Sequence, residues 1–210
     1  KGVERCLAAG EPGLAFDLFQ YVLLLDPEND RAHKGLGHVK VDGTWVRKFE
    51  AEQMRRGLVW DKKFGWMKSA DKARYEKGEF WDFSADRWTT LEEANRAHSD
   101  WNSHWVIKTE HFELRSSANL DRSVEVAERL EAFYLQLFRQ YDLFFAPKGS
   151  GGAAALIFGV SPSQQQPLVV NFYRDQGQFK AHANPPTDWA AGFYSGGSHA
   201  SYFYDMGNSY

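Results

Sequence analysis

The sequence predicts an α+β protein of 210 residues built from three parts. Three observations lead to this prediction. Apolar residues recur at helical spacing near the start, tryptophans recur at a regular interval in the middle, and strand-like segments alternate with helical ones after residue 105. The predicted parts are a helical hairpin over 1–42, a small tryptophan-rich repeat module over 43–104, and a mixed sheet with packed helices over 105–210.

The composition excludes several classes of protein. With 43% hydrophobic and 16% aromatic residues, the chain is too apolar to be disordered. It contains no apolar stretch of about 18 residues, so we expect no membrane span. The single cysteine excludes an internal disulfide framework and a multi-cysteine zinc site. A net charge of −3 provides no basic surface for nucleic acid, so we expect no nucleic-acid partner.

The charged residues are unevenly distributed along the chain. Only five of the 53 lie in 151–210, the last glutamate is Glu131, and the same final segment carries 11 aromatic side chains. A segment so poor in charge is either buried on both sides or forms a surface that another element covers. A buried sheet is the simpler interpretation. In either case this end of the chain offers no pair of glutamates for acid–base catalysis.

Residues 4–38 have the pattern of two helices. The first ends before Pro27, because proline disfavours the helical conformation of the residue that precedes it. Asn29 or Asp30 then caps the second helix. Several positions keep the spacing of the tetratricopeptide repeat: Ala15, Phe19, Val22, Pro27, Leu36 and Gly37. The segment therefore resembles part of a tetratricopeptide array, which implies a helical pair whose apolar side is completed by a neighbouring element.

Residues 43–105 contain seven of the eight tryptophans. Trp45 and Trp66 are each followed by a glycine at position +12 and by a tryptophan at position +15, so the pattern repeats with a period of 21. Each copy predicts a short strand, a charged helix that ends at glycine, and an extended aromatic segment. The rings either fill a small core, which is the favoured interpretation, or form a surface for peptide or sugar. Thr90 and Glu93 then predict a capping box for a helix that ends near His98.

Residues 105–210 predict the element order β–β–α–β–α–β–β. The alternation over 105–115 indicates a strand pair or a bent strand, and Asn119 or Asp121 caps a long helix. A buried strand over 168–173 follows, then a short helix capped by Asp175, and finally a hairpin over 191–204.

The residues of this sequence form no complete catalytic constellation. None of the seven histidines belongs to an H-E-x-x-H motif, the strongest signal of a zinc peptidase. His111 and Glu113 would share one face of a strand, where a structural pair is expected. His98 and His104 are expected to be packing or surface residues, and Cys6 a small buried apolar residue.

Three runs of the last part nevertheless resemble a bacterial family grouped with the gluzincins, the thermolysin-like zinc metallopeptidases. They are HWVIKTEHFELRSSANLDRSVEVAERLEAFYLQLF (104–138), LVVNFYRDQGQF (168–179) and AGFYSGGSHASYFYD (191–205). The resemblance implies that a helix bearing H-E-x-x-H follows Tyr210 in the full-length protein. Zinc and a glutamate base would act there, so the chain as given is expected to hold no catalytic residue and no metal. An exported or periplasmic location is implied by the resemblance alone.

The resemblance also implies a binding strand. In gluzincins the strand before the zinc helix lines the cleft and pairs with the backbone of a peptide substrate by β-augmentation. Here that edge strand would be Ser198, His199, Ala200, Ser201, Tyr202, Phe203, Tyr204 and Asp205. The expected function is therefore the non-catalytic upstream portion of a zinc-metallopeptidase-like protein, whose partners are a peptide and the rest of its own polypeptide beyond Tyr210. The alternative is a protein–protein interaction module without enzymatic activity. A carbohydrate-binding module, a third option, lacks a supporting acidic or amide cluster.

Overall fold

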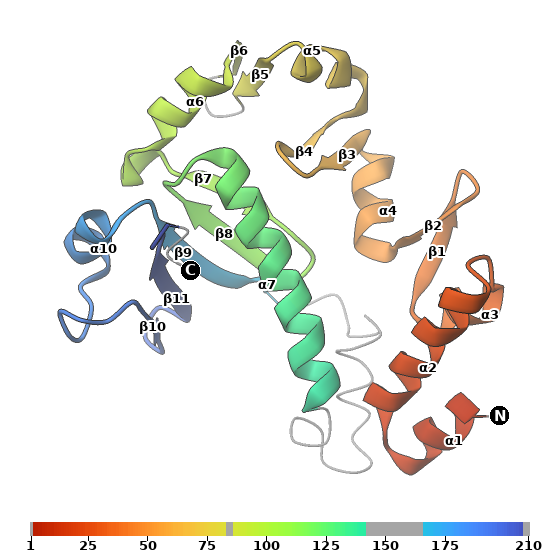
Figure 1. Cartoon of the computed structure of the whole chain (residues 1–210). Helices are drawn as coiled ribbons and strands as arrows, with labels where there is room; N and C mark the ends of the chain where they lie inside the picture. The colour runs from red at the N-terminus through yellow and green to blue at the C-terminus, as the bar shows by residue number, and fades with distance from the viewer. Residues whose placement is uncertain (1, 83–85, 142–165, 208–210) are drawn as a thin grey trace. The chain divides into compact units, whose positions relative to one another are not determined.

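The computed structural model describes residues 2–82, 86–141 and 166–207 and confirms the predicted α+β class (Figure 1). The chain divides into two compact units. One contains residues 1–56 and 132–166, and the other contains residues 57–131 and 167–210. Within the described residues, no helix combines the length and apolar character needed to cross a membrane.

The first unit begins with three helices, α1 (Gly2–Ala9), α2 (Pro12–Leu25) and α3 (Asp30–Gly35). The single helix expected before Pro27 is therefore two helices. Gly10 takes a left-handed conformation with φ 74°, and Pro12 starts the next helix, where its missing N–H costs nothing. Asn29 caps α3 as predicted, since its Oδ1 accepts a hydrogen bond of 3.0 Å from the amide of Ala32.

The three helices share a small apolar core. Ala15 and Leu36 are buried, and the side chains packed against them are Val3, Cys6, Phe16, Phe19 and Leu23. Cys6 thus packs against this core, although it is only partly buried and not fully buried as expected. Other apolar side chains of α2 stay in solvent, with Leu24 77% and Leu25 69% exposed.

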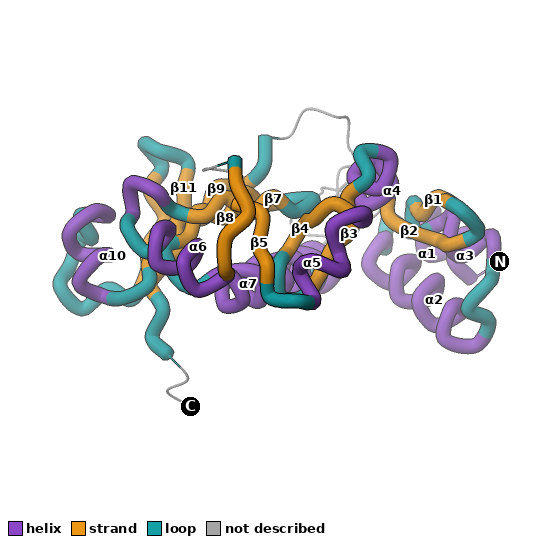
Figure 2. Tube along the Cα trace, turned by 90° about the horizontal axis from the view of Figure 1, so that it is seen from above, coloured by secondary structure: helices purple, strands orange, loops and turns teal. Residues whose placement is uncertain are grey.

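Three copies of a hairpin followed by a helix come next. They are β1 (His38–Val41), β2 (Thr44–Arg47) and α4 (Lys48–Arg55) in the first unit, then β3 (Leu58–Asp61), β4 (Gly65–Lys68) and α5 (Lys72–Glu76), and finally β5 (Glu79–Asp82), β6 (Arg87–Thr90) and α6 (Leu91–His98) in the second unit (Figure 2). A short 3-10 turn, Ser69–Asp71, precedes α5. The predicted period of 21 is close to the observed one, since the three copies begin 20 and 21 residues apart, but the predicted phase and copy number are wrong. The predicted copy joined the second strand of one hairpin to the first strand of the next, and the third copy was missed.

Each copy begins after a glycine in the left-handed region. Gly37, Gly57 and Gly78 have φ values of 76°, 76° and 86°, which other residues adopt only with strain. The three hairpins also place a cross-strand pair at the same register position, namely Lys40 with Trp45, Trp60 with Trp66, and Trp81 with Trp88. The predicted capping box at the start of α6 is present, with Thr90 as the cap.

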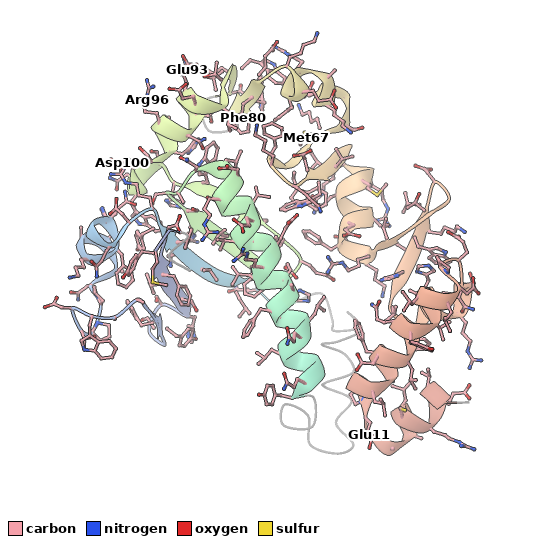
Figure 3. All side chains as sticks on the ribbon, in the orientation of Figure 1. Glu11, Met67, Phe80, Glu93, Arg96 and Asp100 are labelled. Atoms are coloured by element: carbon pink, nitrogen blue, oxygen red, sulfur yellow. The ribbon has the colours of Figure 1, made fainter. Side chains whose placement is uncertain are left out.

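Aromatic packing joins the two copies of the second unit. Tyr75 of α5 contacts Phe80 and Trp88 of the next hairpin, each with ring centroids 5.7 Å apart. Phe80 in turn contacts Trp105, with centroids 5.5 Å apart. Met67 and Phe80, both labelled in Figure 3, are 2% and 4% exposed. Tyr75, Phe80 and Trp105 are therefore core residues, whereas Trp88 packs beside them and is only partly buried.

The second unit ends in a five-stranded mixed sheet with the spatial order β10-β11-β9-β8-β7. Its strands are β7 (Trp105–Lys108), β8 (Phe112–Ser116), β9 (Leu168–Tyr173), β10 (Gly192–Ser195) and β11 (Ala200–Tyr204). β8, β9 and β11 run parallel, while β7 and β10 are antiparallel to their neighbours. The strand pair over 105–115 and the final hairpin are confirmed.

Two helices cover opposite faces of the sheet. α7 (Leu120–Gln140) crosses the face that carries Leu114 and Phe172, and Ser123 on this helix bonds Ser116 with an Oγ–Oγ distance of 2.7 Å (Figure 1). α10 (Gln176–Ala183) covers part of the other face, where the Phe179 ring lies 5.2 Å from the Tyr204 ring. Asp175 caps α10 as predicted.

The contact between α2 and α3 yields a stability prediction. A Cβ on Gly35 would lie 2.2 Å from Cζ of Phe19, so Gly35→Ala must displace the Phe19 ring from its core. We expect a loss of about 1–3 kcal/mol in the free energy of unfolding, the usual cost of overpacking. The measurement is urea unfolding followed by circular dichroism.

Gly2→Ala is the matched control, because its Cβ would meet its nearest neighbour, Leu18, at 3.7 Å. Equal stability of Gly35→Ala and the unaltered protein would contradict the packing of Phe19 against α3.

Candidate functional site

The histidines and carboxylates of the described residues do not gather into a metal centre. No group of three or more His, Cys, Asp or Glu side chains that could hold an ion occurs in ranges 2–82, 86–141 and 166–207. His98 and His104 are packing residues, as expected. The His98 ring stacks on Trp105 with centroids 3.7 Å apart, and the His104 ring stacks on Trp101 at 4.7 Å.

The expected pair of His111 and Glu113 is wrong. β7 ends at Lys108 and β8 begins at Phe112, so His111 lies in the turn and shares no strand face with Glu113. Glu113 instead accepts from Arg115, with a shortest distance of 2.8 Å, and lies 3.4 Å from Lys108 Nζ.

His111 instead bonds to Glu131 on α7. Its backbone N–H donates to Oε1 at 2.8 Å, and its ring Nδ1 lies 2.7 Å from Oε2. Burial alone would raise the pKa of Glu131, which is only 8% exposed, but hydrogen bonds from His111 and Thr109 hold that pKa below its usual 4.5. No local pattern in the sequence indicates this pair, because its members are far apart in sequence and lie on different elements. The pair fixes the β7–β8 turn to α7.

The predicted peptide-binding strand is not at the edge of the sheet. Ala200–Tyr204 form β11, which pairs with β10 on one side and with β9 on the other, so both of its backbone edges are occupied. Ser198 and His199 lie in the turn before β11, and Asp205 follows β11. The edge assignment of Ser198–Asp205 is therefore corrected. The hairpin was predicted, but the insertion of its second strand beside β9 depends on long-range pairing.

The strand at this edge is β10. It is antiparallel to β11, and within the described residues no strand pairs with its other side. Tyr194 of β10 and Phe203 of β11 lie on the same face of the sheet as Val170 and Phe172, as the register shows. Val170 and Phe172 are buried, yet Tyr194 is 63% and Phe203 41% exposed. We call β10, Tyr194 and Phe203 the β10 edge.

The surroundings of the β10 edge are aromatic and uncharged. Trp189, which precedes β10, is 83% exposed. Phe203 lies directly across Gly192, where a Cβ would approach its ring to 2.2 Å. Residues 189–204 contain no Asp, Glu, Lys or Arg. This arrangement can bind an extended, apolar chain through backbone hydrogen bonds and ring contacts.

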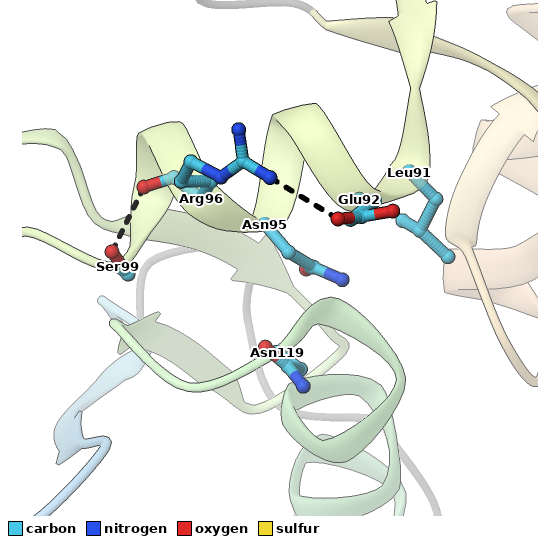
Figure 4. A pocket seen from close by; sticks show the side chains of 6 residues that line it. All are labelled: Leu91, Glu92, Asn95, Arg96, Ser99 and Asn119. Carbon is cyan, nitrogen blue, oxygen red and sulfur yellow. Dashed lines mark hydrogen bonds and ion pairs between the residues drawn. The ribbon is translucent and has the colours of Figure 1, made fainter.

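An open pocket of approximately 420 Å³ lies beside α6 and the start of α7 (Figure 4). Several of its polar groups already have partners within the protein. Arg96 pairs with Glu92 at 3.1 Å, Asn95 Oδ1 accepts from the amide of Leu120 at 2.8 Å, and Ser99 Oγ donates to the Arg96 carbonyl at 2.8 Å. Its lining therefore resembles a capped helix junction more than a binding site. The lining residues are Leu91, Glu92, Asn95, Arg96, Ser99 and Asn119.

The buried carboxylate gives a pH-dependent prediction. We expect Glu131→Gln to lower the free energy of unfolding by about 1–3 kcal/mol at pH 7, because a charged acceptor for two His111 donors is lost. A lowered folded pKa means that this stabilisation is present above pH 4.5 and is lost as the pH falls through the folded value. The difference between the two proteins should therefore shrink toward pH 3.5. Urea unfolding at pH 7, 5 and 3.5 measures it.

Glu92→Gln is the control for that series, since the Glu92 side chain is 85% exposed and a change there should have little effect at any pH. A difference between Glu131→Gln and the unaltered protein that stays constant from pH 7 to pH 3.5 would exclude the proposed role of the Glu131 charge.

No protein-family model matches the chain, and neither the curated proteins nor the solved structures give a significant match. Membership of a gluzincin-like family therefore stays a prediction, which is based on the resemblance of residues 104–138, 168–179 and 191–205. The α+β fold is shown by the structure itself.

Proposed function

We propose that this chain is the non-catalytic upstream portion of a zinc-metallopeptidase-like protein and that it binds an extended peptide along the β10 edge. The observation that carries the proposal is an edge strand whose outer side pairs with no described strand and whose exposed side chains are aromatic. Edge strands of this kind accept a further strand, because their N–H and C=O groups on the outer side need hydrogen-bond partners.

The side chains suggest which peptides fit. A strand added beside β10 would alternate its side chains between the two faces of the sheet. On the face shared by Tyr194 and Phe203, it would meet aromatic rings. Since residues 189–204 contain no Asp, Glu, Lys or Arg, apolar or uncharged side chains are favoured there, and a charged one would lose hydration without gaining an opposite charge.

Hydrolysis would need groups that the chain as given does not supply. The sequence contains no H-E-x-x-H, and the resemblance to the gluzincins places that motif after the last hairpin. Zinc bound there would activate water, with the motif's glutamate as base. The role of this chain in that proposal is to hold and align the peptide.

A protein–protein interaction module without enzymatic activity is the second candidate. It is favoured by the exposed apolar side chains on α2, where Leu24 and Leu25 are 77% and 69% exposed. Tetratricopeptide-like helices generally bury such side chains against a neighbouring repeat.

The coding sequence after Tyr210 separates the two candidates. The first predicts that it encodes a helix with H-E-x-x-H and that the full-length protein contains one equivalent of zinc by elemental analysis. A stop codon, or a following helix without the motif, contradicts the metallopeptidase proposal and supports the second candidate.

Peptide binding at the β10 edge has its own test. A phage-displayed library of linear dodecapeptides is selected against the chain, and the best synthetic peptide is titrated by calorimetry. Tyr194→Lys should weaken its affinity at least about tenfold, equivalent to 1.4 kcal/mol, because the ring contact is lost and a lysine on an edge opposes strand addition. Hydrogen exchange should show protection of β10 amides in the complex.

Val106→Lys provides the matched control, because Val106 lies on β7, the opposite edge of the sheet, and is 52% exposed. Binding lost equally in both variants, or protection confined to β7, would contradict the assignment of the site to β10.

A further inference from the structure

Two histidines in the first unit share one hydrogen bond. His33 lies on α3 and is 8% exposed, while His38 is the first residue of β1. Their Nδ1 atoms lie 2.9 Å apart, and His33 Nε2 lies 2.7 Å from the carbonyl oxygen of Pro27. The His33 ring also stacks on Trp45 of β2, with centroids 4.6 Å apart and planes at 11°. The pair therefore connects α3 to the first hairpin.

The position of the protons follows from the partners. A carbonyl oxygen only accepts, so His33 Nε2 must carry a hydrogen and donate it to Pro27. In the neutral His33 ring, Nδ1 then holds a lone pair, and His38 Nδ1 must be the donor in the bond between the two rings. His38 Nδ1–H therefore donates a hydrogen bond to His33 Nδ1, and His33 Nε2–H donates one to the Pro27 carbonyl oxygen.

This arrangement accommodates one additional proton but not two. A proton added at His38 Nε2 leaves the bond between the Nδ1 atoms intact. A second proton would have to enter at His33 Nδ1, and two N–H groups would then face each other across 2.9 Å. Full protonation is therefore incompatible with the contact.

The surrounding charges do not compensate for the two positive rings. Arg47 and Glu50, which flank His38 from β2 and α4, bind each other, with the Arg47 amide 2.9 Å from Glu50 Oε2. Two ion pairs also involve charged residues of α3 and β1, namely Lys34 with Asp30 and Lys40 with Glu28. Burial, with a smaller effect from His33, lowers the pKa of His38 below its usual 6.5, although Glu50 opposes the shift.

We propose that His33 and His38 form a proton-sensitive latch, which holds the β1–β2 hairpin against α3 at neutral pH and releases it when both rings are protonated. The first proton leaves the bond between the two rings intact, so the latch stays closed at neutral pH. It opens when the second proton is taken up, at a pH below about 6.5, the usual pKa of histidine. Acidification would thus loosen the connection between the tetratricopeptide-like helices and the first hairpin.

Nitrogen-15 NMR of the histidine rings tests the proton positions. At pH 7.5 we expect the Nε2–H tautomer for His33 and the Nδ1–H tautomer for His38. The reverse assignment, or Nε2–H in both rings, would overturn the proposal. This measurement uses the unaltered protein and does not depend on the folding of any variant.

Hydrogen exchange tests the release. Between pH 7.5 and pH 5, protection of the amides of Val39 and Val41, corrected for the intrinsic rate, should fall at least about fivefold, equivalent to about 1 kcal/mol, the usual net contribution of one hydrogen bond. His38→Gln should abolish most of this fall. A glutamine amide can donate to neutral His33 Nδ1 and can rotate to accept from the protonated ring, and it does not titrate.

Two further variants control the exchange experiment. His38→Leu removes the bond at every pH, so its β1 protection should be low at both pH values. His199→Gln alters an exposed histidine of the second unit and should behave like the unaltered protein. Protection that is constant with pH in the unaltered protein, or an equal fall in His38→Gln, would refute the latch.

Discussion

The second unit depends on the burial of one sheet face by the first part of α7. Val124 on this helix and Leu114 on β8 are both fully buried, and the apolar contact is accompanied by the buried hydrogen bond between Ser123 and Ser116. The polar side chains of the same helix bond to segments distant in sequence. Arg122 pairs with Asp205 after β11, Glu128 accepts from Trp60 Nε1, and Glu131 accepts from His111. One helix thus fixes the sheet, the β7–β8 turn and the second hairpin together.

The same helix explains why the β10 edge is accessible. An α-helix is about 10 Å across with its side chains, and neighbouring strands are about 4.8 Å apart, so one helix covers two or three strands. α7 covers the face at β8 and β9, where Val170 and Phe172 are buried. At β11 and β10 the face continues with Phe203 and Tyr194, which remain exposed. In the described part of the charge-poor segment 151–210, residues 166–207, the uncharged side chains thus include both a buried sheet centre and an exposed aromatic margin.

The hairpin–helix copies also bury their aromatic side chains against neighbouring elements. A single hairpin with one short helix is too small to bury its own aromatic face. In the second unit, Tyr75 of one copy covers Phe80 and Trp88 of the next, and Phe80 packs on Trp105 at the start of the sheet. This succession of contacts buries Tyr75, Phe80 and Trp105. In the first unit, Trp45 packs against His33 instead, which places the histidine pair at the junction with the helices.

Local patterns in the sequence determined most of the elements, and the tertiary structure decided how they meet. Pro27, Asn29, Thr90 and Asp175 set helix ends through their own backbone restrictions and caps, so these could be predicted from a few neighbouring residues. The period of the tryptophan repeat was visible for the same reason. The break at Gly10 was missed because a glycine within a helical pattern does not by itself reveal a left-handed conformation.

The candidate site depended on contacts that no local pattern encodes. The hairpin over 191–204 was predictable, but its place in the sheet was not, because β11 pairs with β9, a strand distant in sequence, and leaves β10 outside. His111 likewise lies in the turn before β8 and bonds to Glu131 on α7, not to Glu113 as expected. Periodicity and capping depend on residues close in sequence. Strand order and buried hydrogen-bonded pairs depend instead on contacts between surfaces that are distant in sequence. The sequence therefore determined the elements and the scarcity of charge, and the tertiary structure determined which strand is exposed at the edge.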